Sequence, residues 1–156
     1  GRRMVTQRRG TIIQISSTAG LTGFPANGAY SASKFALEGF SESLREELAS
    51  LGVHVHLLEL GNCDTSFFGH NFRAVESTVP NGPVDQALEF FDSRRQSQES
   101  ICLSATDVSK TILAITNSPD APFRVMLGRE ATVAASAKIE NLSADLERSG
   151  SFQPEP

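Results

Sequence analysis

The amino-acid sequence predicts an α/β protein, and more narrowly the second half of a doubly wound parallel sheet whose N-terminal βαβ half is missing. Strand-like and helix-like stretches alternate along the 156 residues, which is the pattern of a parallel sheet covered by helices. Only three stretches are strand-like, which is few for such a sheet. No two of the twelve glycines are spaced as G-x-G, so these residues lack the turn that cradles phosphates in the first half of this fold.

The first unit is a strand, a helix and a second strand, which together make one crossover of a parallel sheet. Residues 11–16 (TIIQIS) are rich in β-branched side chains, and residues 53–60 (VHVHLLEL) form the second strand. Between them the pattern over 29–51 is helical, with Asn27 as the N-cap and Gly52 at the C-terminal end. The apolar face of this helix carries Ala36, Phe40, Leu44, Leu48 and Leu51. The opposite, polar face carries Glu38, Glu42, Arg45 and Glu46.

The remainder of the chain predicts three further helices and a third strand. One helix is centred on Val84, Ala87, Leu88 and Phe91. Another runs over about 106–117 and is followed by a strand over 123–127. The last helix is amphipathic and carries Ile139, Leu142 and Leu146. We expect residues 1–149 to belong to one domain and residues 150–156 to be a frayed tail.

The region 62–104 begins with a long stretch, up to residue 83, that has no clear periodicity. Long connections of this kind often act as binding lids, so we interpret 62–104 as a substrate-binding loop region. Its aromatic residues Phe67, Phe68 and Phe72 fit a substrate lid and an ordinary core equally well.

Ser17, Tyr30 and Lys34 are the candidate catalytic residues. Tyr30 and Lys34 are four apart at the start of the predicted helix, so they share a face with a rise of roughly 6 Å between them. A free tyrosine has a pKa of about 10, and a nearby lysine cation favours the phenolate, which can then exchange a proton with an alcohol or ketone oxygen. Ser17 ends the preceding strand, at the sheet edge where ligands of open α/β sheets bind. Taken without context, however, such spacings fit a surface tyrosine, a solvated lysine and a strand-end hydroxyl better.

The surrounding sequence supplies that context, because residues 11–61 closely resemble the short-chain dehydrogenase/reductase family. The matching features are the strand ending in ISS, the following Gly20, the YSASK box with its helix, and the strand that leads to Leu60-Gly61-x-x-x-Thr65. The family usually has proline where this chain has Leu60, a departure that removes no reacting group.

The resemblance implies a Rossmann-like, nicotinamide-dependent oxidoreductase that interconverts an alcohol and a ketone or aldehyde. Tyr30 would be the catalytic acid/base, and Ser17 would orient the substrate oxygen beside it. Lys34 would bind the nicotinamide ribose and tune Tyr30, while Gly61 and Thr65 would line the nicotinamide. The implied cofactor is NAD or NADP, with NADP favoured, although the residues that select between them belong upstream of this chain.

The resemblance also implies a small-molecule alcohol or carbonyl substrate and a homo-oligomer paired through the helix 29–51. Without the half that binds most of the cofactor, we expect the 156 residues alone to be inactive. The alternative hypothesis is a truncated, non-catalytic interaction module that keeps the fold and pairs through the same helix. The upstream genomic sequence distinguishes the two, because an in-frame glycine motif there favours the enzyme.

Composition argues against several other classes of protein. The formal net charge is −4, with acidic and basic residues interspersed, which disfavours a nucleic-acid-binding face. No apolar run approaches the roughly 20 residues that span a bilayer, and no signal peptide is recognisable, so we expect a cytoplasmic protein. Cys63 and Cys102 lack CxxC spacing and are interpreted as free thiols. His54 and His56 share a strand face, but a metal site needs more ligands, so no metal is expected.

Overall fold

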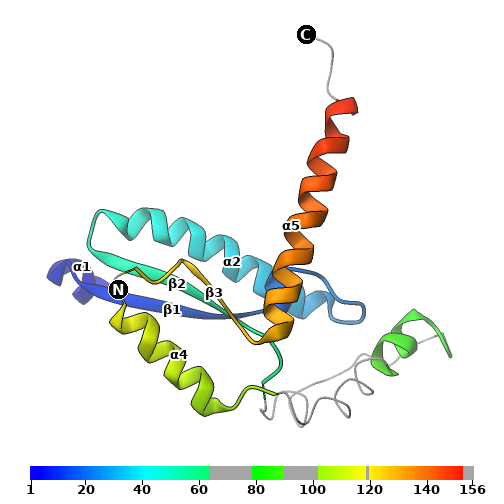
Figure 1. Cartoon of the computed structure of the whole chain (residues 1–156), viewed down its shortest axis with the longest axis horizontal. Coiled ribbons are helices and arrows are strands. Elements are labelled where there is room, and N and C mark those ends of the chain that lie inside the picture. Colours follow the sequence, from blue (N-terminus) through cyan, green and yellow to red (C-terminus); the bar gives the residue numbers. More distant parts are fainter. Residues whose placement is uncertain (64–78, 90–101, 119, 153–156) are drawn as a thin grey trace.

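A computed structural model of the chain describes residues 1–63, 79–89, 102–118 and 120–152. These residues form a three-stranded parallel sheet with helices on both faces (Figure 1). In chain order the elements are α1 (Arg2–Gln7), β1 (Gly10–Ser17), η1 (Thr18–Gly20), α2 (Gly28–Ala49), β2 (Val53–Leu60), α4 (Ala105–Asn117), β3 (Arg124–Leu127), α5 (Arg129–Ser149) and η3 (Gly150–Phe152). Residues 83–89 are also helical.

The sheet has the order β1-β2-β3, and both neighbouring pairs are parallel. This arrangement confirms the predicted α/β class and the predicted strand–helix–strand unit. In the register of the sheet, Ser17 lies opposite Leu60, and Leu60 lies opposite Leu127. The carboxyl ends of the three strands therefore meet at one edge, which is where open α/β sheets bind ligands.

The core is centred on β2, which has a strand on each side. Val55 is 4% exposed, and Leu57 and Leu58 are completely buried. The consecutive residues 55–59 of β2 point alternately to the two faces of the sheet, and all five are buried. Both faces are buried because helices cover both of them. Glu59 is also completely buried, and a charge at such a position requires compensating partners.

The face of α2 that packs on the sheet is only partly the predicted one: Leu44 and Leu48 are half-buried as expected, but other positions differ. Phe40, which was expected to face the core, is 57% exposed. Glu38, which was expected on the solvent side, is 5% exposed, and Ser41 is completely buried. The prediction was wrong because it placed only apolar side chains against the sheet, whereas the buried carboxylate has hydrogen-bonding partners there.

The turn from α2 into β2 explains the glycine that follows the helix. Gly52 has φ +71°, a left-handed conformation that side chains with a Cβ rarely adopt. An added Cβ would also lie 2.3 Å from the carbonyl oxygen of Arg8. At the other end of α2, Asn27 occupies the predicted N-cap position but its side chain makes no capping hydrogen bond.

The last helix, α5, runs from the end of β3 away from the sheet (Figure 1). The predicted helix is confirmed, but its apolar residues Ile139, Leu142 and Leu146 are 55–76% exposed. The predicted frayed tail begins as a helical turn, η3, and residues 153–156 lie outside the described part of the chain. Among the described residues, no helix combines the length and the apolar character that crossing a membrane requires.

Candidate functional site

Lys34 joins α2 to the carboxyl end of β1. Its Nζ donates a hydrogen bond of 2.9 Å to the carbonyl oxygen of Ile15 and lies 5.7 Å from the centroid of the Tyr30 ring. Burial lowers the pKa of Lys34, and the carboxylate of Glu38, one turn further along the helix, opposes that shift. The arrangement holds a partly desolvated cation beside a phenol at the edge of the sheet where the strands end.

Tyr30 occupies the first turn of α2, as the spacing predicts. Its side chain is half-buried, and so is that of Lys34. Residues four apart in a helix lie on one face, and the cation–π contact between the two side chains shows that they do so here. A helix that begins just after the loop from β1 therefore places both groups over the end of that strand.

Ser17 is the last residue of β1 and the N-cap of η1. Its Oγ accepts a hydrogen bond of 3.2 Å from the backbone N–H of Ala19. A serine hydroxyl has one donor and two acceptor positions, so this bond orients the oxygen without using its proton. The preceding residue, Ser16, is 2% exposed and hydrogen-bonds on the opposite face of the strand.

Gly61 follows directly after β2, beside the end of β3. Its N–H donates a hydrogen bond of 2.8 Å to the carbonyl oxygen of Leu127. A Cβ at this position would lie 3.3 Å from that oxygen and 2.9 Å from Oε2 of Glu130, so the backbone passes close to both. Thr65, the second residue predicted to line the cofactor, lies outside the described residues, as do Phe67, Phe68 and Phe72.

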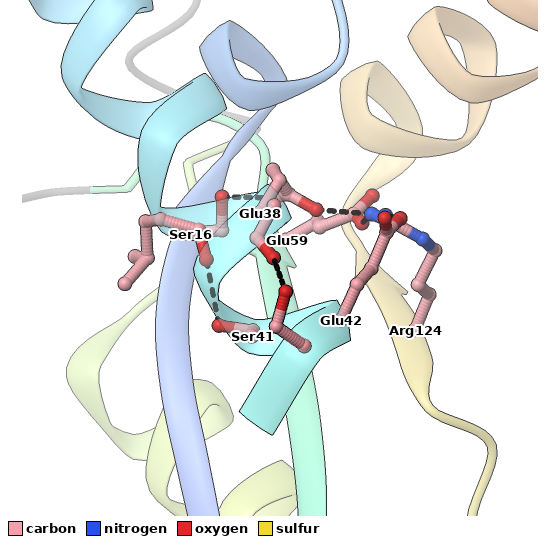
Figure 2. A network of polar contacts seen from close by, with 9 residues as sticks. Ser16, Glu38, Ser41, Glu42, Glu59 and Arg124 are labelled. Atoms are coloured by element: carbon pink, nitrogen blue, oxygen red, sulfur yellow. Dashed lines mark hydrogen bonds and ion pairs between the residues drawn. The ribbon is translucent and has the colours of Figure 1, made fainter. Parts of the chain in front are cut away.

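The structure also contains a buried charge network that the sequence analysis missed. Arg124, at the start of β3, forms ion pairs with Glu38, Glu42 and Glu59 (Figure 2). The Arg124–Glu59 and Arg124–Glu42 contacts are both 2.6 Å. Ser16 Oγ donates a hydrogen bond to Glu38 from the other side. We name these five residues the Arg124 network.

In the Arg124 network, burial and hydrogen bonding shift pKa values in opposite directions. Burial raises the pKa of Glu59, although the hydrogen bond from Arg124 lowers it. Burial alone would lower the pKa of Arg124, but the hydrogen bonds to its three carboxylate partners raise it overall. Glu59 Oε2 is buried and has no hydrogen-bond partner among the described residues. A sequence signal did exist, because a glutamate inside the apolar run LLEL must be paired once the strand is central.

Among the residues that the structure describes, the histidines and cysteines do not join these groups. His56 is buried, and its Nδ1 lies 2.9 Å from the carbonyl oxygen of Pro122. Cys63 and Cys102 are half-buried, and burial together with the neighbouring Cys102 raises the pKa of Cys63. Within the described ranges, no three histidine, cysteine or acidic side chains are grouped as metal ligands would be.

Comparison with known sequences gives consistent results. The family model for short chain dehydrogenase matches residues 2–76. The chain is 31% identical over 142 residues to Oxidoreductase BOA17 of Botryotinia fuckeliana, covering 91% of this chain and 51% of that protein. It is 33% identical over 126 residues to bovine retinol dehydrogenase 8, covering 78% of this chain and 40% of that protein. The chain thus spans about half the length of the curated relatives it matches.

Solved structures show the same fold. A short-chain dehydrogenase from Streptomyces avermitilis is 26% identical with a TM-score of 0.77, over 96% of this chain and 54% of that one. A short-chain dehydrogenase/reductase from Burkholderia phymatum, solved in complex with NAD, is 25% identical with a TM-score of 0.62, over 92% of this chain and 50% of that one. The sheet, the YSASK helix and these likenesses agree: the chain belongs to the short-chain dehydrogenase/reductase family.

Proposed function

We propose that this chain supplies the acid/base part of a nicotinamide-dependent oxidoreductase that interconverts an alcohol and a ketone or aldehyde. The observation that carries the proposal is the position of the Lys34 ammonium. It is anchored on the Ile15 carbonyl oxygen and lies 5.7 Å from the Tyr30 ring centroid, at the carboxyl end of β1. A cation held there can stabilise negative charge that develops on the phenol oxygen during proton transfer.

In the proposed reaction, Tyr30 exchanges the proton and Ser17 positions the reacting oxygen. During alcohol oxidation, Tyr30 Oη takes the hydroxyl proton, and during carbonyl reduction it returns a proton to the oxygen. The Ser17 hydroxyl donates a hydrogen bond to the same oxygen, since its lone pair already accepts from Ala19 N–H. Both residues therefore contact substrate as well as taking part in the chemistry.

The residues at this edge fit a nicotinamide cofactor, which when bound accepts or gives the hydride. An ammonium has three N–H donors, and the described contacts of Lys34 use one of them, on Ile15. The others suit the hydroxyls of the cofactor ribose. Gly61 and Thr65 are proposed to line the nicotinamide, as the family resemblance implies. Support for a nicotinamide cofactor comes from the NAD complex of the Burkholderia phymatum relative.

We also propose that α2 pairs with the α2 helix of a second copy, and that residues 62–104 border the substrate. Phe35 and Phe40 on α2 are 41% and 57% exposed, and burying such aromatic side chains favours association. A purely non-catalytic module would pair through the same surface, so this surface does not distinguish the two functions. Substituting the acid/base residues and measuring turnover does.

The deciding experiment substitutes Tyr30 in the natural protein that contains this chain. Tyr30→Phe removes the proton-transferring oxygen but keeps the ring, so we expect turnover to fall roughly 100- to 10,000-fold. The Kd for NADH or NADPH, measured by fluorescence titration, should change little. Ser43→Ala, an exposed serine on the same helix, is the control and should keep full turnover. Near-normal turnover by Tyr30→Phe would show that the catalytic assignment is wrong.

A further inference from the structure

The Arg124 network lies beneath the proposed site and connects every strand of the described sheet to α2. Ser16 is on β1, Glu59 is on β2, Arg124 is on β3, and Glu38 with Glu42 is on α2. Figure 2 shows Glu38 between Ser16 on one side and Arg124 on the other. Glu38 is thus the member that joins the β1 side of the network to the β3 side.

The end of β1 is tied to α2 by two neighbouring residues. Lys34 Nζ donates to the Ile15 carbonyl oxygen, and Ser16 Oγ donates to the Glu38 carboxylate. Lys34 and Glu38 are one helical turn apart on α2, and their partners are adjacent residues of β1. The two hydrogen bonds therefore lie next to each other. Ser17, the residue proposed to position the substrate oxygen, comes directly after them.

The loop that follows Ser17 also rests on the network. A Cβ added at Gly20, in η1, would lie 2.7 Å from Ser16 Oγ and 2.8 Å from Glu38 Oε1. The Ser16–Glu38 pair is therefore packed against the backbone of η1. Because Ala19, in the same turn, holds Ser17 Oγ through its N–H, the pair supports the hydrogen bond that orients the Ser17 hydroxyl.

We propose that Glu38 is a positioning residue: held by Arg124, it fixes Ser16 and η1 and so sets the orientation of the Ser17 hydroxyl relative to Tyr30 and Lys34. The inference rests on the proposed function for its catalytic consequence, but the positioning itself is a property of the fold. Ser16 acts here only through Glu38 and the adjoining backbone.

The test compares Ser16→Ala and Glu38→Gln with Ser43→Ala and Glu46→Gln, which are exposed serine and glutamate controls on α2, in the natural protein. Ser16→Ala removes the hydroxyl but leaves the Glu38–Arg124 ion pair, so it should fold even if Glu38→Gln does not. We expect kcat to fall about tenfold in Ser16→Ala, because small misplacements of a catalytic group cost that much or more. The Kd for the cofactor should stay close to that of the unmodified protein.

A second readout needs no catalysis: the hydrogen-exchange rate of the Ala19 amide, measured by NMR. We expect this rate to rise in Ser16→Ala and to stay unchanged in the two controls. Unchanged exchange together with an unchanged kcat in folded Ser16→Ala would overturn the positioning role, even if Tyr30→Phe is inactive. Faster Ala19 exchange combined with an active Tyr30→Phe variant would instead support the positioning role and reject the proposed chemistry.

Discussion

Lys34 Nζ hydrogen-bonds the carbonyl oxygen of Ile15 at 2.9 Å, two residues before Ser17. This contact fixes an ammonium on a strand rather than in solvent, and the cost of its desolvation is visible as a lowered pKa of Lys34. The affinity for the cofactor should therefore depend both on where the Lys34 ammonium is held and on the pH at which it loses its proton.

We predict that the affinity of the natural protein for NADH or NADPH falls at alkaline pH because Lys34 loses its charge. The ammonium is charged at low pH and is neutralised as the pH rises through its pKa, which burial lowers relative to a free lysine. The decline should begin at a lower pH in Glu38→Gln, since the Glu38 carboxylate raises the pKa of Lys34. The measurement is Kd against pH by fluorescence titration.

The control for this prediction is Lys34→Arg, because a guanidinium keeps its charge throughout that range. Its affinity at neutral pH can differ from that of the unmodified protein, but it should not decline with the same alkaline midpoint. Identical pH profiles for the lysine and arginine proteins would remove Lys34 as the titrating group.

We predict that Arg124→Met destabilises the fold by about 3–5 kcal/mol, the typical cost of leaving buried charges without their partner. Glu38 and Glu59 would then face each other without a cation, both being nearly or completely buried. Adding Glu59→Gln to Arg124→Met should recover part of the loss by removing one of those charges. Urea denaturation of each variant measures the free energy of unfolding.

Arg148 offers a matched control, because it pairs with Asp145 on α5 through side chains that are 74% and 65% exposed. Exposed ion pairs contribute little to stability, so Arg148→Met should unfold almost as the unmodified protein does. If Arg124→Met were equally harmless, the Arg124 network would not hold the strands together.

We predict that Glu59→Gln changes how stability depends on pH. Burial raises the folded-state pKa of Glu59 above its unfolded value, so the folded protein binds the proton more tightly. The unmodified protein therefore loses stability as the pH rises from about 4.3, the ordinary glutamate value, through the raised pKa. Glutamine cannot titrate, so the variant should gain relative stability between mildly acidic and neutral pH. A constant difference across urea melts in that range would contradict this assignment.

Much of the fold could be predicted because strand and helix periodicity is local. The strand predicted over 53–60 is β2, residue for residue, and the helix predicted over 106–117 is α4 with one added residue at its start. The four-residue step from Tyr30 to Lys34 likewise predicts that the two side chains share a helix face, but only the family resemblance of residues 11–61 marks them as catalytic candidates.

The Arg124 network was not accessible from periodicity alone. Helical periodicity places Glu38 on the polar face of its helix, and the strand pattern over 53–60 does not set Glu59 apart from its neighbours. The burial of both glutamates depends on Arg124, which is 86 residues from Glu38 in the sequence. A pairing of that range exists only once β3 is placed beside β2, so a pattern confined to one helix cannot reveal it.

Our last prediction tests whether the Arg124 network is packed against η1 as tightly as described. Gly20→Ala would place a Cβ 2.7 Å from Ser16 Oγ and 2.8 Å from Glu38 Oε1. Both side chains are buried and held by partners, so they cannot move aside freely. We expect a loss of about 1–3 kcal/mol in the free energy of unfolding, as for other overpacked sites.

Gly23→Ala is the control for this substitution, because a Cβ there would meet nothing within 4 Å and the residue has no positive φ. It should be neutral or slightly stabilising, since alanine restricts the unfolded chain more than glycine does. Combining Gly20→Ala with Ser16→Ala removes the nearest of the contacted atoms, so the double variant should be more stable than the sum of the single effects predicts. If the two changes in the free energy of unfolding were strictly additive in urea melts, Gly20 would not be packed against the Ser16–Glu38 pair.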